Sequence, residues 1–299
     1  MSESSKVLFV INRHSGTGYR DSLEGRIVSA CEKRGLECSI EFTKKPGHGS
    51  TLAKMAVKKN YAAVFAVGGD GTVNEVAQGL LHSSVPLGII PKGSGNGLAR
   101  HLHIPLQIDK ALQLLELKRV IPIDTFTING RLSLNVSGIG FDGFVAGQFG
   151  KDGKRGLAGY GKLVVSHFKQ FKEFTSTLKS FEDTSQRKAF IISIANSSQF
   201  GNNAIIAPQA SVCDSELDIC IVKKMSVWEG LSFVNKLFTH SLHRSRLMAH
   251  FKAKSISITT DNQIPYHIDG EAVGSASQFD VNINPASLLI SIPEGRHKV

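Results

Sequence analysis

The stretch Tyr61-Ala-Ala-Val-Phe-Ala-Val-Gly-Gly-Asp-Gly-Thr72 decides the fold of this chain. Its apolar first half predicts a buried strand, and the glycines from Gly68 onward predict a tight loop. Behind the loop, apolar residues recur at helical spacing, at Val73, Val76, Ala77, Leu80 and Leu81. Glycines let backbone N–H groups approach a phosphate that a Cβ would hold off, and the N-terminus of the helix adds partial positive charge. The sequence therefore predicts a phosphate-binding loop between a strand and a helix.

Asp70 is the unexpected member of this loop, because a site for an anion has no need of a carboxylate. The carboxylate is explained if a metal ion accompanies the phosphates, or if a hydroxyl group must lose a proton. A tight turn that carries a solvated aspartate is the alternative interpretation.

A second glycine loop follows the next apolar run. Pro86-Leu-Gly-Ile-Ile-Pro91 has the composition of a short buried strand, and Lys92-Gly-Ser-Gly-Asn-Gly-Leu-Ala-Arg100 continues it into a loop and a helix. Two such loops on successive parallel strands lie at the carboxyl edge of the sheet, where open α/β sheets bind ligands. We therefore expect both loops to contribute to one site.

In this order the loops resemble the diacylglycerol kinase catalytic fold, which bacterial lipid kinases share with sphingosine and ceramide kinases. The resemblance begins at Asn12-Arg-His-Ser-Gly-Thr-Gly18, where Arg13 stands in place of the family's usual proline. It covers nearly the whole chain and continues through Thr43, Gly47-His48, Gly68 to Thr72, Asn74-Glu75, Gly93 to Asn96, and Asp269-Gly270-Glu271.

The resemblance implies an ATP site that uses Mg²⁺. The residues it would place at the nucleotide are Asn12, Thr43, Gly68, Gly69, Asp70, Gly71, Thr72, Asn74, Glu75, Gly93, Ser94 and Asn96. It also implies that Glu271 is the general base that takes the proton from a lipid hydroxyl, although Asp70 remains a second candidate for that role. Asp142 lies where such kinases often carry an aspartate on the substrate side. The two catalytic carboxylates stand about two hundred residues apart, so we expect two domains that form one nucleotide cleft.

The segment Ala210-Ser-Val-Cys-Asp-Ser-Glu-Leu-Asp218 resembles a family loop that binds a structural Mg²⁺. The resemblance implies three ligands: the carboxylate of Asp214 and the backbone carbonyls of Ser211 and Glu216. Sparse protein ligation suits magnesium, which keeps several waters. Ser215 stands where the family usually has glycine.

The alternation of strands and helices up to residue 122 predicts an α/β domain with a parallel sheet. The resemblance implies that this domain is similar to that of NAD kinase. Residues 123–284 are strand-rich, with a hairpin turn at Asn129-Gly130, and the resemblance implies a β-sandwich there. Residues 285–299 are expected to return to the first domain. Two stretches interrupt the strand pattern, Leu157 to Phe171 and Trp228 to His250. Each has an apolar helical face that would suit an interfacial helix, the wall of a lipid cleft, or ordinary core.

The chain has 299 residues and a net charge of +10. Residues 144–190 carry nine basic and four acidic side chains, and residues 223–254 carry seven and one, so these two segments hold +5 and +6. The sequence contains no recognisable nucleic-acid-binding motif, and we favour an anionic membrane as the partner over a solvated basic face.

No apolar run reaches the roughly 20 residues that span a bilayer. The four cysteines lack Cys-x-x-Cys spacing. We expect a cytoplasmic protein at the membrane periphery; its oligomeric state cannot be read from the sequence.

These observations favour an ATP-dependent lipid kinase that acts on a diacylglycerol-type or sphingoid-type hydroxyl. A kinase for a small molecule, similar to NAD kinase, shares the Gly-Gly-Asp-Gly loop, but Gly93 to Asn96 speaks against it. A catalytically silent lipid-binding protein is the third interpretation. Ser94-Gly95-Asn96 looks more like the version found in sphingosine and ceramide kinases than like that of many bacterial diacylglycerol kinases.

Overall fold

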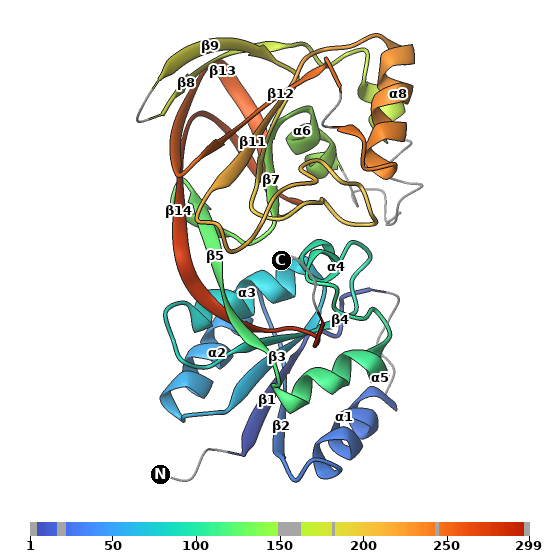
Figure 1. Cartoon of the computed structure of the whole chain (residues 1–299), viewed down its shortest axis with the longest axis vertical. Helices are drawn as coiled ribbons and strands as arrows, with labels where there is room; N and C mark the ends of the chain where they lie inside the picture. Colours follow the sequence, from blue (N-terminus) through green and yellow to red (C-terminus); the bar gives the residue numbers. More distant parts are fainter. Residues whose placement is uncertain (1–4, 17–21, 149–162, 181–182, 243–244, 296–299) are drawn as a thin grey trace. The chain divides into compact units, whose positions relative to one another are not determined.

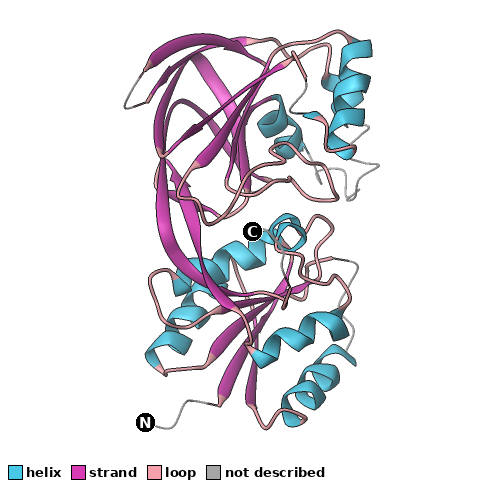
Figure 2. Ribbon diagram, in the orientation of Figure 1, coloured by secondary structure: helices cyan, strands magenta, loops and turns pink. Residues whose placement is uncertain are grey.

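The computed structural model describes residues 5–16, 22–148, 163–180, 183–242 and 245–295. The chain divides into two compact units (Figures 1 and 2). Unit 1 comprises Met1–Asp124 together with Pro285–Val299, and unit 2 comprises Thr125–Asn284.

Unit 1 is a parallel sheet with helices. Its strands are buried along nearly their whole length, except at the edge strand β2, as is usual for sheets covered on both faces. The order is β4-β3-β1-β2, and the end of β14 joins β4 through the pair Ile290 and Leu87. The strands are β1 (Lys6–Ile11), β2 (Glu37–Phe42), β3 (Ala63–Gly68) and β4 (Leu87–Pro91). The helices are α1 (Ser22–Glu32), α2 (His48–Lys58), α3 (Asp70–Leu80), α4 (Gly97–His101), α5 (Ile108–Ala111) and the 3₁₀ helix η1 (Leu112–Glu116).

The order of the strands places the glycine loops at one edge. From β1 the chain proceeds through α1 to β2 on one side, whereas β3 and β4 follow on the other side of β1. The reversal lies between β1 and β3, where doubly wound sheets bind their ligands. Both glycine loops, and the loop that starts at Asn12, leave the sheet at this carboxyl edge.

Unit 2 is built mainly from antiparallel strands around its own apolar core. The order is β12-β11-β10-β7-β13-β14, with β5 on β14, β6 on β5, β8 on β13 and β9 on β8. The strands are β5 (Val120–Ile128), β6 (Arg131–Ser133), β7 (Val136–Gly140), β8 (Phe174–Lys179), β9 (Thr184–Ala189), β10 (Ile191–Ala195), β11 (Leu217–Val222), β12 (Met248–Ala253), β13 (Ser255–Ile268) and β14 (Glu271–Ser291). Its two named helices are α6 (Phe141–Gln148) and α8 (Val227–Phe238).

The predicted α/β and β-rich halves are confirmed, and three local expectations need correction. The helical pattern from Trp228 to His250 ends at Phe238, and His250 lies in strand β12. The sequence also predicts one helix from Ile108 to Leu117, which the structure divides between α5 and a 3₁₀ helix. Strands β8 and β9 were not expected from the sequence. The first part of the apolar pattern at 157–171, up to residue 162, lies outside the described residues.

Candidate functional site

The two glycine loops touch through their backbones. The Lys92 amide donates to the Gly68 carbonyl over 2.8 Å. A Cβ on Gly93 would lie 2.5 Å from the Gly69 Cα, and a Cβ on Gly68 would lie 2.5 Å from the Thr72 Oγ1. These distances are too short for any side chain. Glycine is therefore required for the contact, and the space that a Cβ would fill lies beside the N-terminus of α3.

The loop that begins at Asn12 is hydrogen-bonded to the segments that form the two glycine loops. The Asn12 amide N–H donates to the Val67 carbonyl over 3.1 Å, and its Nδ2 donates to Thr72 Oγ1 over 3.2 Å. The Lys92 ammonium donates to the Ser15 carbonyl over 2.8 Å. Partial burial lowers the pKa of Lys92. These bonds hold Asn12, Thr72 and Lys92 at one edge of the sheet.

Asn96 closes the second glycine loop on itself. Its Oδ1 accepts from the Gly93 amide over 3.0 Å, and its Nδ2 donates to the Gly93 carbonyl over 2.8 Å. Its backbone has a φ of +50°, a conformation that asparagine tolerates better than most residues. Ser94 is exposed at the tip. A Cβ on Gly95 would lie 3.2 Å from Asp70 Oδ2, so the Asp70 carboxylate faces this loop.

The other residues predicted at the nucleotide have distinct surroundings. Thr43 follows β2 at the same edge, where its amide donates to the Ile11 carbonyl over 3.0 Å. Asn74 Oδ1 accepts from Gln78 on the next turn of α3. The Glu75 carboxylate accepts from the amides of Gly47 and Gly49 over 2.9 and 3.0 Å. Glu75 thus binds the N-terminus of α2, a structural role that the sequence did not reveal.

This arrangement fits a phosphate chain. Glycine backbones, the N-terminus of α3 and the side chains of Thr72 and Asn96 form a polar edge where no Cβ can intrude on the contact between loops. The Asp70 carboxylate, at the first position of α3, is an oxygen ligand of the kind that Mg²⁺ binds.

In unit 2 the Asp-Gly-Glu sequence forms the turn between β13 and β14. Asp269 and Gly270 both have positive φ, +48° and +86°, as a type I′ hairpin turn requires. The Asp269 carboxylate accepts from Ser133 Oγ over 2.7 Å and from the amides of Leu134 and Asn135, each over 3.0 Å. Asp269 therefore fixes the turn, and the turn presents the exposed Glu271 at the start of β14.

Asp142 is buried and paired with His267, a residue that the sequence analysis did not single out. Asp142 Oδ2 lies 3.4 Å from His267 Nε2, and its Oδ1 accepts from the Gly143 amide over 2.8 Å. His267 Nδ1 accepts from the Gly270 amide over 3.1 Å. The predicted substrate residue is thereby connected to the Asp-Gly-Glu turn. The only signal in the sequence is that His267 stands two positions before Asp269.

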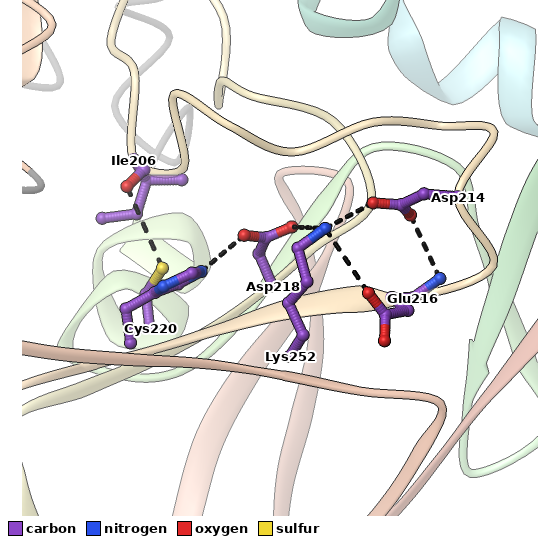
Figure 3. Close-up of polar contacts among 7 residues, drawn as sticks. Ile206, Asp214, Glu216, Asp218, Cys220 and Lys252 are labelled. Atoms are coloured by element: carbon purple, nitrogen blue, oxygen red, sulfur yellow. Dashed lines mark hydrogen bonds and ion pairs between the residues drawn. The ribbon is translucent and has the colours of Figure 1, made fainter.

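The predicted magnesium loop contains a competing cation. The Lys252 ammonium, from β12, contacts the Asp214 carboxylate and lies 3.6 Å from Glu216 Oε2 and 4.0 Å from Asp218 Oδ2 (Figure 3). The hydrogen bond to Asp214 raises the pKa of Lys252. Within the described part of the chain, no group of three or more His, Cys, Asp or Glu residues could hold a metal. The ligand set of Asp214, Ser211 and Glu216 stays a prediction, with Lys252 bound to its one carboxylate.

Comparison with known proteins identifies the family. Residues 6–128 match the diacylglycerol kinase catalytic domain, and residues 136–292 match the YegS C-terminal NAD kinase beta sandwich-like domain. The chain belongs to the diacylglycerol kinase family. Membership makes it a kinase of the lipid kinase group, and the order of its two matched domains agrees with the two units described above.

Individual relatives extend over most of the chain. A Pseudomonas aeruginosa protein named "probable lipid kinase YegS-like" is 28% identical, and the alignment covers 90% of this chain and 89% of that protein. A diacylglycerol kinase of Staphylococcus saprophyticus is 28% identical, with 83% of each chain covered. An uncharacterized protein of Synechocystis is 31% identical, but this chain spans only 64% of its length. A crystal structure of a putative diacylglycerol kinase from Bacillus anthracis has the same fold, with a TM-score of 0.80, 24% identity and 98% coverage of both chains.

Proposed function

We propose that this protein is an ATP-dependent lipid kinase that transfers the γ-phosphoryl group to the hydroxyl of a diacylglycerol-type or sphingoid-type lipid. The observation that carries the proposal is the backbone contact between Gly68 and Lys92, and between Gly69 and Gly93, at the carboxyl edge of the parallel sheet. Phosphoryl transfer relies on positioning and on electrostatic stabilisation, and both are properties of such a rigid loop pair.

The roles follow from the chemistry of each group. Backbone amides of the two loops, with Thr43, Thr72, Ser94 and Asn96, bind the phosphates. Asp70 holds the Mg²⁺ that, when bound, neutralises charge on the phosphates. Asn12 keeps Thr72 in place through the hydrogen bond described above. These residues all belong to unit 1.

Glu271 is the proposed general base, which takes the proton from the lipid hydroxyl. It is exposed, and Asp269 fixes the turn that carries it. Asp142 contacts the acceptor or, through His267, holds this turn in position. We further propose that the protein works from the cytoplasm at the membrane surface. Among the described residues, no helix is both long enough and apolar enough to cross a bilayer.

The test is transfer of labelled phosphate from ATP to diacylglycerol, sphingosine and ceramide in micelles, with NAD as a soluble acceptor. We expect a lipid product, and Asp70→Asn should abolish it while the circular dichroism spectrum is unchanged. Asp109→Asn, a change of the same kind at an exposed position of α5, is the matched control. Phosphorylation of NAD alone would establish the small-molecule kinase instead. Failure with every acceptor would support a silent lipid-binding protein.

A further inference from the structure

Helix α8 exposes an apolar face that the phosphoryl-transfer chemistry does not use. In the described part of the chain nine large apolar side chains are exposed, and five of them lie on this helix. Their exposed fractions are 47% for Val227, 80% for Trp228, 57% for Leu231, 42% for Val234 and 40% for Phe238. So many exposed apolar side chains on one helix indicate an interaction surface, whereas scattered single ones do not.

The exposed residues form one stripe because of their spacing. Positions 227, 231, 234 and 238 recur every three or four residues, and Trp228 borders the stripe. The other side of the helix is anchored in the protein. Phe233 is buried in a core cluster, and a Cβ on Gly230 would lie only 3.4 Å from the Phe168 ring. Ser226 and Glu229 form a capping box at the N-terminus of α8. The stripe is therefore displayed by a fixed helix.

The surrounding charge selects the partner. Residues 223–254 contain seven basic side chains and one acidic one, Glu229, whose carboxylate accepts from the Ser226 amide; one of the seven, Lys252, is ion-paired with Asp214 in the cluster described above. Lys224 is engaged with the carbonyls of Phe168 and Phe171, but Lys223 and Arg246 are exposed. A second copy of this chain would bring the same positive charge against itself. An apolar stripe with a tryptophan at its border, on a helix that carries Lys236 within a basic segment of the sequence, suits the headgroup region of an anionic bilayer.

We infer that the stripe of Val227, Trp228, Leu231, Val234 and Phe238 docks the protein on anionic membranes, with these side chains inserted at the boundary between headgroups and acyl chains. The inference deepens the proposed function, since a lipid acceptor lies in a membrane, but binding can be measured without ATP and without turnover.

Trp228 is the only tryptophan in the chain, so the native protein carries its own probe. We expect vesicles of phosphatidylglycerol and phosphatidylcholine to shift its emission to the blue and to protect it from a water-soluble quencher. Pure phosphatidylcholine should do so less, and salt should reverse the effect. If the protein sediments with the anionic vesicles while the emission stays unchanged, another surface binds and the inference is wrong. A blue shift that grows with protein concentration in the absence of lipid would instead indicate contact between copies.

Leu231→Ser provides the second test, because a side chain this exposed contributes little to the fold. Vesicle binding should weaken by roughly tenfold. Leu106→Ser, which removes an exposed leucine from unit 1, should bind as the native protein does. Transfer to a short-chain acceptor dissolved as monomers should be unaffected by Leu231→Ser. If the native protein transfers no phosphate but its tryptophan emission still shifts to the blue on vesicles, the kinase proposal alone is wrong. If Leu231→Ser binds vesicles as tightly as the native protein, the docking inference alone is wrong.

Discussion

Gly93 lies against the backbone of Gly69, and this contact leaves no space for a methyl group. We predict that Gly93→Ala separates the two loops, lowers the free energy of unfolding by about 1–3 kcal/mol and weakens ATP binding measured by calorimetry. Gly25→Ala is the control, because among the described residues nothing outside the helix's own backbone lies within 4 Å of the added methyl on α1. It should be neutral or stabilise by up to about 1 kcal/mol. Native ATP affinity in Gly93→Ala would show that the loop contact does not shape the nucleotide site.

His101, at the end of α4, makes the stability of the protein depend on pH. Burial lowers the pKa of this imidazole to about 4, with a smaller effect from His103. Between the unfolded value of about 6.5 and this folded value, the unfolded chain binds more protons, so stability is lost as the pH falls. We predict that this group alone lowers the free energy of unfolding by about 2 kcal/mol when the pH falls from 7 to 5.

His101→Gln should remove that part of the pH dependence, because glutamine stays neutral. Urea unfolding at pH 7 and pH 5 measures the difference, and the exposed His14→Gln provides the control. If the free energy of unfolding falls equally between pH 7 and pH 5 in His101→Gln and in the native protein, another group titrates between these pH values.

At the scale of elements, β11 and β12 are joined by backbone pairing and by the Lys252 ammonium. Asp218 lies opposite Lys252 in the register, and the same ammonium contacts Asp214 in the loop before β11 (Figure 3). The sequence predicts Mg²⁺ in this loop and the structure places a lysine there, so the melting temperature of the native protein in Mg²⁺ and in EDTA distinguishes the two. If the Lys252 ammonium is the cation of this cluster, the melting temperature responds to neither.

Lys252→Met should destabilise the fold by about 1 kcal/mol, which is near the upper limit for a partly exposed ion pair. Its melting temperature should then rise with Mg²⁺, since the carboxylates of Asp214 and Glu216 lose the ammonium that lies beside them. Lys254→Met, at an exposed position close by, should behave as the native protein does. If Mg²⁺ raises the melting temperature of the native protein as much as that of Lys252→Met, the loop binds the metal in spite of the lysine.

At the scale of the whole molecule, the two proposed catalytic carboxylates belong to different units, Asp70 to unit 1 and Glu271 to unit 2. We predict that Glu271→Gln lowers kcat by roughly 10²-fold, the contribution of a general base, and leaves the Kd for ATP nearly unchanged. Initial rates at saturating lipid and calorimetry with ATP measure the two quantities.

The exposed Glu294→Gln, in unit 1, is the matched control and should keep full activity. Loss of ATP binding equal to the loss of rate would make Glu271 a metal ligand on the nucleotide side. The general base would then have to be Asp70.

The sequence alone determined the features that depend on neighbouring residues. Buried parallel strands appear as continuous apolar runs, and glycine loops between strand and helix appear as fixed spacings, so the loops at Gly68 and Gly93 were predictable. The positive φ angles at Asn129-Gly130 and at Asp269-Gly270 likewise depend on these residue pairs themselves, because asparagine, aspartate and glycine tolerate such angles. The α-helix over residues 228–238 was predictable too, because apolar residues recur there every three or four positions.

Only the tertiary structure decided what each side chain meets. It brought Lys252 to Asp214, His267 to Asp142, and Glu75 to the N-terminus of α2. It also decided that the stripe of α8 is exposed, since a helical period does not say which side faces the core. The physical reason is the same in each case. Contacts between residues far apart in the chain depend on strand order and register, and a sequence pattern with a short period carries no information about either.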